Sequence, residues 1–293
     1  MSISQAGILD PVCGQARYLS FALLSDADPR ESLCALAENA VDNDCVVGIG
    51  ASLVANLGCK IEGLKNFPVF EQSSLNIPST PASLWIWLRG EDRGELIHRT
   101  RFFCELLDEA FECTEIVDAF KYGEGLDLSG YVDGTENPEA DDAISAAIQQ
   151  DDNPDLAGSS FVAVQQWVHD LDYLSSLSPQ QQDLIIGRRK TDNEEIDDAP
   201  SYAHVKRTAQ ESFSPEAFIL RRSMPWADAD DEGLMFIAFG KSFDAYETLL
   251  KNMLGLNDDV TDGLFRFSTP VSGAYYWCPP VKNNLLNLAA LDL

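Results

Sequence analysis

Basic residues are scarce in this sequence. Lysine and arginine number 20 against 48 aspartate and glutamate residues, so the net charge is −28 over 293 residues. This charge repels phosphate backbones and anionic lipid headgroups at long range, and we therefore expect neither a nucleic-acid partner nor a membrane partner. The acidic residues are dispersed in polar stretches such as 149–155, 192–198 and 227–233, which is typical of a solubilising surface.

Long hydrophobic runs and a cysteine framework are also lacking. No run of 18 apolar residues occurs, and the first 15 residues are too polar for a secretory signal. The seven cysteines form no CxxC pair, and their odd number argues against a closed disulfide framework. These absences predict a cytoplasmic protein in a reducing compartment. The hydrophobic content of 45% is sufficient for a buried core and two domains or two fused halves.

Histidine is the scarcest residue with metal-binding chemistry, since only His98, His169 and His204 occur. His98 falls within a predicted helix beside Arg99 and Arg101, so a solvated or helix-packing role explains it best. His169 ends a predicted strand next to Asp170, and a structural hydrogen bond explains it best. His204 lies in a loop-like stretch and, taken alone, is also better explained as structural. A zinc site needs three or four protein ligands. Haem iron needs only one imidazole, because the porphyrin supplies four nitrogens.

Two similar orders of strands and helices follow one another along the chain. The first comprises strand 16–24, a helix with Asp28 as N-cap and Pro29 at its first position, strands 45–54 and 83–90, a helix capped by Asp92, and strand 113–122. The second comprises strand 159–170, a helix capped by Ser178, strands 217–223 and 233–240, a helix from Ser242 toward Gly255, and strand 273–280.

This repetition predicts an α+β fold made of two ferredoxin-like βαββαβ halves, with antiparallel sheets and helices packed on them. We place an N-terminal domain at residues 1–129 and a C-terminal domain at 130–293. The stretches 123–158 and 189–216 remain irregular. Long loops in compact domains are either functional or mobile, so these two are the places to search for chemistry.

The first irregular stretch contains the sequence GYVDGTENP at 130–138. Its Asp133-Gly134 pair is ordinary turn chemistry, because aspartate bonds its own backbone and glycine tolerates positive φ. On the residues alone, this stretch marks a turn.

GYVDGT also matches the GxxDGT signature of the dye-decolourising peroxidases, and the resemblance extends over residues 130–280. The segments that are similar to that family, in order, are SSFVAVQQWVHDL, IIGRRKTDNEEIDD, SYAHVKR, FILRRSMPW, GLMFIAFG and DGLFRFSTPVSGAYYWCPP. One short signature would be weak, but several in the family's order are specific. The first 129 residues resemble the family in pattern more than in wording.

The resemblance implies one haem b per chain, bound in the C-terminal half. It makes His204 the axial iron ligand, Asp133 the distal carboxylate and Arg221 the distal guanidinium. Asp262 would be the proximal acid that hydrogen-bonds the other ring nitrogen of the ligand. The further residues expected to contact the cofactor are Gly130, Gly134, Thr135, Ser223 and Phe236. Ser223 stands where some relatives have asparagine.

The resemblance further implies a peroxidase that reduces hydrogen peroxide and oxidises an aromatic or dye-like donor through a ferryl intermediate, and a homo-oligomer of two or more chains. Peroxide must lose a proton from one oxygen and gain one on the other, and a single carboxylate such as Asp133 can perform both transfers. Arg221 would stabilise the negative charge on the leaving oxygen. A haem-delivery or iron-releasing protein and a haem-free structural protein are the alternatives. An acid and a guanidinium together favour catalysis.

Overall fold

The computed structural model describes residues 3–42, 44–150 and 153–293. Its N-terminal half forms an antiparallel sheet of order β4-β1-β3-β2, and a helix lies in each connection between strands that follow one another in the sequence. The elements of this half are α1 (Ala6–Leu9), β1 (Gln15–Leu23), α2 (Arg30–Asn39), β2 (Cys45–Gly50), α3 (Ala51–Asn56), β3 (Leu84–Gly90), α4 (Arg93–Leu107) and β4 (Phe111–Phe120).

The C-terminal half repeats this strand order, with β10 beside β5, β5 beside β8, and β8 beside the short strands β6 and β7. Its main elements are β5 (Ser160–His169), α7 (Pro179–Ile186), β6 (Leu220–Arg221), β7 (Met224–Ala227), β8 (Glu232–Gly240), α9 (Asp244–Met253) and β10 (Ala274–Cys278). The smaller ones are α5 (Ala140–Ala147), α6 (Leu171–Ser176), α8 (His204–Arg207), η1 (Gln210–Ser212), η2 (Gly263–Arg266), β9 (Ser268–Pro270), β11 (Val281–Lys282), β12 (Leu285–Leu286) and η3 (Ala289–Leu291). The predicted fold of two ferredoxin-like halves is confirmed.

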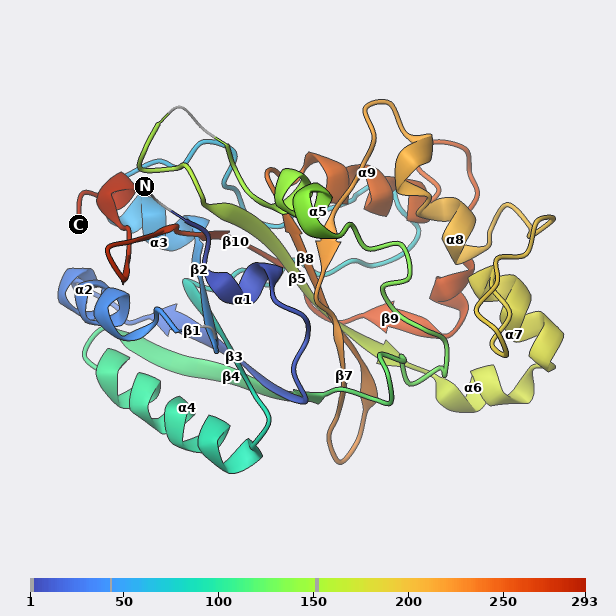
Figure 1. The fold of residues 1–293 in the computed structure, drawn as a ribbon, viewed down its shortest axis with the longest axis horizontal. Helices are drawn as coiled ribbons and strands as arrows, with labels where there is room; N and C mark the ends of the chain where they lie inside the picture. Colours follow the sequence, from blue (N-terminus) through green and yellow to red (C-terminus); the bar gives the residue numbers. More distant parts are fainter. Residues whose placement is uncertain (1–2, 43, 151–152) are drawn as a thin grey trace.

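The two sheets join at both edges into one closed antiparallel ring. β2 pairs with β10, where Ile49 lies opposite Trp277, and β4 pairs with β7, where Ala119 lies opposite Trp226. Closure removes the open edges that two separate sheets would expose. In Figure 1, α2 and α4 lie beside the N-terminal strands at one end of the molecule, and α7 and α8 lie at the other end.

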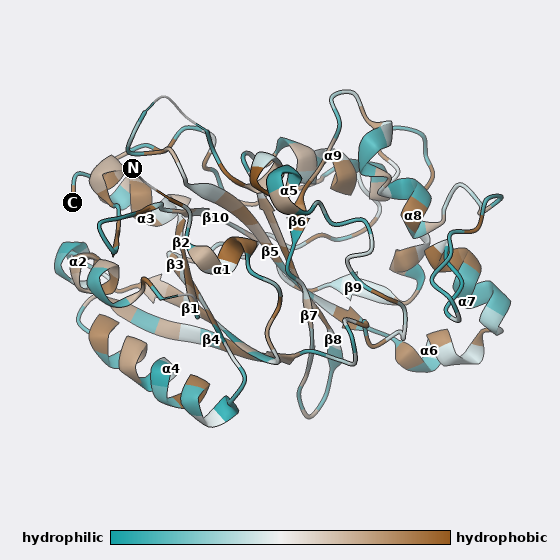
Figure 2. Ribbon diagram, viewed as in Figure 1, coloured by the Kyte–Doolittle hydropathy of each residue, from teal (hydrophilic) through white to brown (hydrophobic). Residues whose placement is uncertain are grey.

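Side chains on the inner face of the ring form one core shared by both halves. Tyr18 stacks between Trp85 and Trp87, with ring centroids 6.1 and 6.0 Å apart. From the second half, Tyr276 stacks on Trp85 at 5.8 Å and Phe239 on Trp87 at 6.2 Å. The opposite faces of the strands pack against the helices in a second core. Figure 2 shows hydrophobic colour along the central strands and hydrophilic colour in the loop between α7 and α8.

The structure corrects two of the predicted strands. Residues 45–54 form β2 only as far as Gly50, and the helix α3 follows, because a short apolar run does not distinguish a strand from a buried helix. The predicted strand 217–223 is reduced to Leu220–Arg221, since the loop bearing Asn137 bonds to the backbone of Arg221. The irregular stretches also contain helices that periodicity did not predict: α5 at Ala140–Ala147 and α8 at His204–Arg207.

The predicted helix starts are close to those observed. Helix α2 begins at Arg30, one residue later than predicted, and Asp28 accepts a hydrogen bond from its first amide at 3.2 Å. Ser178 forms the expected capping box with Gln181. Across the described ranges, no helix combines the length and apolar character needed to cross a membrane.

Replacing Asp92 with alanine is expected to lower the free energy of unfolding by about 1 kcal/mol. Its carboxylate accepts hydrogen bonds from the amides of Gly94 and Glu95, at 2.7 and 3.1 Å, and so caps the start of α4. Urea unfolding followed by circular dichroism measures the change. Asp108→Ala, at the opposite end of the same helix, is the control, because an acid there opposes the helix dipole. Equal destabilisation by both variants would contradict the capping role.

Candidate active site

A pocket lies on the outer face of the C-terminal sheet, between the strands β5 and β8 and the helix α9. Part of this pocket is open to solvent. Leu234 and Phe236 line it from β8, and Leu249, Leu250 and Met253 line it from α9. Most of this wall is apolar, so the few polar side chains in the pocket are the informative ones.

His204 enters the pocket from the first residue of the short helix α8. Its Nδ1 lies 2.8 Å from Oδ2 of Asp262, a carboxylate that is 1% exposed. The other oxygen of Asp262 accepts a hydrogen bond from the amide of Leu264 at 2.8 Å. The acid therefore fixes the orientation of the imidazole and leaves Nε2 as the ring nitrogen available to a metal.

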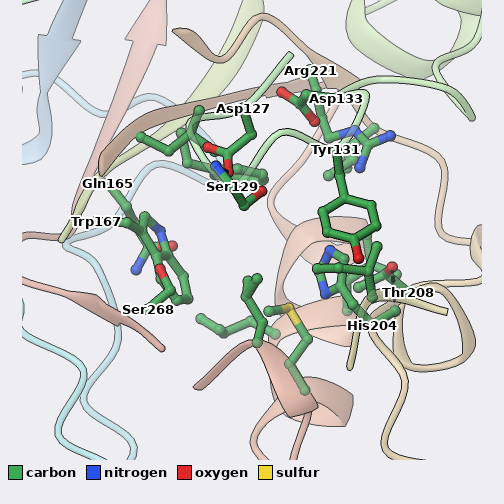
Figure 3. A pocket seen from close by; sticks show the side chains of 18 of the residues that line it. Asp127, Ser129, Tyr131, Asp133, Gln165, Trp167, His204, Thr208, Arg221 and Ser268 are labelled. Carbon is green, nitrogen blue, oxygen red and sulfur yellow. Dashed lines mark hydrogen bonds between the residues drawn. The ribbon is translucent and has the colours of Figure 1, made fainter. Parts of the chain in front are cut away.

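Asp133 and Arg221 line the same pocket, and both also line a neighbouring cavity that opens toward α5. Figure 3 shows Asp133 and Arg221 together at one side of the pocket and His204 with Thr208 at another. Burial raises the pKa of the Asp133 carboxyl, the positive charge of Arg221 opposes that rise, and the nearby Asp127 adds to it. The structure thus brings the predicted imidazole, acid and guanidinium to one cavity.

The loop that carries Asp133 is attached to the strand that carries Arg221. Asn137 accepts a hydrogen bond from the Arg221 amide at 2.8 Å and donates one to the Arg221 carbonyl at 2.9 Å. Gln210, which is 4% exposed, bridges the carbonyl of Glu136 and the amide of Ile219, each at 2.9 Å. These two amides hold the acid and the guanidinium in a fixed relation, and sequence reasoning did not identify them. Asn137 lies two residues after the last residue of the signature, but its position indicated only a turn.

The other predicted contact residues fall in different places. Phe236 lines the pocket, and Gly134 and Ser223 line the neighbouring cavity. Gly130 and Thr135 belong to neither of these two linings in the described part of the chain. Gly130 and Gly134 have φ of 84° and 79°, the left-handed conformation that glycine adopts without steric cost. They form the tight bend expected around Asp133.

Three buried nitrogens in residues that line the pocket have no hydrogen-bond partner among the described residues. They are Nε of Arg221, Nε2 of Gln165 and Nε1 of Trp167. A buried donor without a partner costs about 1–3 kcal/mol. Such donors fit a pocket that holds a further group with acceptor atoms. Among the residues described, no cluster of three or more His, Cys, Asp or Glu side chains could hold a metal ion.

A chain of hydrogen bonds forms another part of the pocket wall. Nε2 of His169 lies 3.0 Å from Oδ1 of Asp127, and Nδ1 lies 2.7 Å from Oγ of Ser268. Burial alone would raise the pKa of Asp127, but hydrogen bonds from His169 and Ser129 hold that pKa below its usual value. The structural hydrogen bond expected for His169 is therefore present at both nitrogens. The serine faces Nδ1 and the acid Nε2, the reverse of the serine hydrolase arrangement.

Comparison with known proteins agrees with this geometry. The model of a family described as "Dyp-type peroxidase, C-terminal" matches residues 124–283. A dye-decolorizing peroxidase of Rhodococcus erythropolis (strain PR4) is 34% identical over 242 residues, which cover 80% of this chain and 71% of that protein. The chain belongs to the dye-decolourising peroxidase family. A dye-decolorizing peroxidase of Mycolicibacterium paratuberculosis is 33% identical over 70% of this chain.

Solved structures of the dye-decolourising peroxidase family share the whole fold. The dye-decolorizing protein from V. cholerae has a TM-score of 0.84 at 27% identity and covers 99% of both chains. DyPB from Rhodococcus jostii RHA1 has a TM-score of 0.85 at 29% identity, covering 94% of this chain and 95% of that one. A variant of that protein was solved in complex with heme. The match to the curated M. paratuberculosis relative spans only 59% of that protein's length.

Proposed function

We propose that this protein is a haem peroxidase, which reduces hydrogen peroxide and oxidises an aromatic or dye-like donor. The observation that carries the proposal is that His204, Asp133 and Arg221 line one pocket, with Nδ1 of His204 already bonded to the buried Asp262. Membership of the dye-decolourising peroxidase family and the heme-bound DyPB variant support it.

The residues of the pocket fit a haem. His204 would bind the iron through Nε2, and Asp262 would make the imidazole more basic. The apolar side chains of α9 and β8 would pack against the macrocycle. We assign Gly130, Gly134, Thr135 and Ser223 to the segments that would border it, Ser223 lying between β6 and β7. When bound, the iron supplies the two-electron chemistry that cleaves the peroxide bond.

Asp133 would move the proton. As a base it accepts the proton of one peroxide oxygen, and as an acid it returns the proton to the other oxygen, which leaves as water. Arg221 stays charged and stabilises the negative charge on that oxygen as the bond breaks. Because burial raises the pKa of Asp133, the acid limb of kcat/KM for peroxide is expected above the ordinary aspartate value of about 3.9.

The acid and guanidinium favour turnover over haem delivery, since storage or transfer of haem needs no proton carrier beside the iron. The acidic surface favours neutral or cationic donors. We further propose a cytoplasmic location, a homo-oligomer of two or more chains, and a division into an N-terminal domain at 1–129 and a C-terminal haem-binding domain at 130–293.

Haem reconstitution and peroxide turnover test the proposal. The protein, titrated with haem, is expected to bind about one equivalent per chain and then to bleach an anthraquinone dye when peroxide is added. One equivalent of peroxide should change the Soret absorption of the loaded protein within the mixing time of a stopped-flow instrument. Haem binding without any bleaching, and with haem passing to an apoprotein acceptor, would support the delivery alternative and contradict the peroxidase.

A further inference from the structure

We propose that an open pocket beside β9 binds the aromatic donor, and that the donor's electron reaches the haem through Phe265 and Trp167. This inference rests on the proposed peroxidase function and names the place of its second half-reaction. The pocket that holds His204 and Asp133, called the haem pocket below, is assigned to the cofactor. A donor therefore needs a separate place that solvent reaches and that adjoins the haem pocket.

The pocket beside β9, called the surface pocket below, has the room and the access that a donor needs. Residues 75–78 of the N-terminal half form one wall, and Phe265 with residues 269–271 forms the other. Its volume of about 340 Å³ falls in the range of small-molecule sites. Val271 is 43% exposed, and Asn76 and Thr269 are exposed as well, so solvent reaches both walls. Within the described ranges, its lining shares no residue with that of the haem pocket.

Phe265 connects the surface pocket to the haem pocket. The centroid of its ring lies 5.5 Å from that of Trp167, with 35° between the ring planes. Trp167 lines the haem pocket, and Figure 3 shows it at the same side as Gln165 and Ser268. Pro270 of the surface pocket also lies opposite Trp167 where β9 pairs with β5. A donor in the surface pocket is thus separated from a side chain of the haem pocket by one ring.

Hydrogen bonds hold the two walls in place. The Thr80 amide, just after the loop wall, donates to the carbonyl of Gly273 at 2.7 Å, and the Thr80 hydroxyl accepts from the Gly273 amide at 3.0 Å. On the other wall, the amide of Val271 donates to the carbonyl of Gln166 at 2.8 Å. Because the walls are joined through Gly273, the surface pocket is preformed, which reduces the entropy that binding would cost.

The walls indicate a neutral aromatic ligand. None of the described residues that line the surface pocket is charged, although 23% of the chain is. Arg266, which follows Phe265, lies over the Tyr202 ring, 4.0 Å from its centroid. A charged ligand would lose hydration here without gaining an ionic partner. Pro78, Pro270 and Phe265 offer flat apolar surfaces, against which an aromatic ring packs well.

Electrons pass one at a time along this route. The indole of Trp167 gives one electron to the cofactor that peroxide has oxidised, and becomes a radical cation. A donor in the surface pocket returns one electron to the indole across the Phe265 ring, and then loses a proton to water and leaves as a neutral radical. Two donors supply the two electrons that one hydrogen peroxide takes up, and with two protons the peroxide becomes two molecules of water.

Binding of guaiacol, an uncharged aromatic donor, to the haem-loaded protein without peroxide tests the site directly. We expect Val271→Lys to weaken the affinity about tenfold, because a charge replaces an apolar part of the wall. Val69→Lys is the matched control, since Val69 is 71% exposed on the same connection between α3 and β3 but belongs to neither wall. It makes the same change in net charge and should bind guaiacol as the wild type does. Titration calorimetry measures both affinities.

Oxidation of guaiacol at saturating peroxide separates binding from electron transfer. Val271→Lys should raise KM about tenfold with little change in kcat, whereas Trp167→Phe should lower kcat about tenfold with little change in KM. The reason for the second effect is that a phenyl ring is much harder to oxidise than an indole. Freeze-quench electron paramagnetic resonance after peroxide addition, without donor, should show an indole radical in the wild type that Trp167→Phe lacks.

Equal guaiacol affinity in Val271→Lys and Val69→Lys would overturn the inference, as would a wild-type kcat and an unchanged radical signal in Trp167→Phe. Light scattering checks a different occupant. If Val271→Lys dissociates an oligomer and leaves the affinity for guaiacol unchanged, the surface pocket belongs to a contact with a second copy of this chain, and the inference is wrong. A wild-type protein that binds guaiacol but does not react with peroxide would instead contradict the proposed peroxidase function.

Discussion

Asp133→Asn is expected to lower kcat/KM for hydrogen peroxide by about two to four orders of magnitude, the range that a positioned acid–base group contributes. The amide keeps the size of the side chain but neither accepts a proton from peroxide nor returns it. The backbone bend should survive, because the Asp133 amide bonds to the carbonyl of Gly125 at 2.9 Å and Gly134 keeps its positive φ. Stopped-flow mixing of the haem-loaded variant with peroxide measures the loss.

Stability separates this loss from unfolding. The folded-state pKa of Asp133 is raised, so the stability that its protonated form provides is present at low pH and is lost as pH rises through the folded pKa. At neutral pH the ionised carboxyl in the folded protein is destabilising, and Asp133→Asn should be at least as resistant to urea as the wild type. Asp172→Asn, an exposed acid on α6, is the control for the change in net charge. A variant that reacts with peroxide at the wild-type rate would refute the assignment.

His204→Ala is expected to weaken haem binding by more than about 10²-fold. Loss of a group that only orients a ligand already costs 10–100-fold, and removal of the ligand itself should cost more. Asp262→Asn should fall in that smaller range, because it disturbs the 2.8 Å contact to Nδ1 but leaves the imidazole. Haem titration followed by absorbance measures the haem affinity of the two variants. The pyridine haemochrome assay gives the number of haem groups bound per chain.

The control for these variants is His98→Ala, since His98 is exposed on α4 and far along the chain from the pocket residues. It should bind haem as the wild type does. Retention of a full equivalent of haem by His204→Ala would contradict the ligand assignment, and a greater loss in Asp262→Asn than in His204→Ala would contradict the ranking. Addition of imidazole to His204→Ala should restore part of the binding, because it supplies the missing nitrogen.

Much of the fold could be predicted from the sequence because local signals agree with it. The caps at Asp92 and Ser178 and the helical spacing behind them marked two helices correctly. The closure of the ring could not be predicted. It depends on short pairings between β2 and β10 and between β4 and β7, which join strands far apart in the sequence. The residues of the strands themselves do not indicate which strand each one pairs with.

The residues of the candidate site also fall into those that the sequence predicted and those that it did not. The signature, the stretch around His204 and the segment FILRRSMPW were enough to select the acid, the imidazole and the guanidinium that the structure brings to one pocket. The amides that hold them were not found, since Asn137 and Arg221 are 84 residues apart. His169 reaches Asp127 across 42 residues and Ser268 across 99, so no spacing rule could have joined them. Contacts of this kind follow from tertiary packing alone.

The shared inner core also bears on how the pocket can be altered. On β5, Gln165 and Trp167 face the pocket, while Val162 and Val164 face the aromatic stack inside the ring. The strands β1–β4 contribute no residue to the pocket lining in the parts of the chain described. Even so, two tryptophans of β3 pack on the inner face of the strands that border the pocket: Trp85 stacks on Tyr276 of β10, and Trp87 stacks on Phe239 of β8. Replacing Trp87 with a smaller residue is therefore a way to shift β8, and with it the pocket, without changing any side chain that lines the pocket.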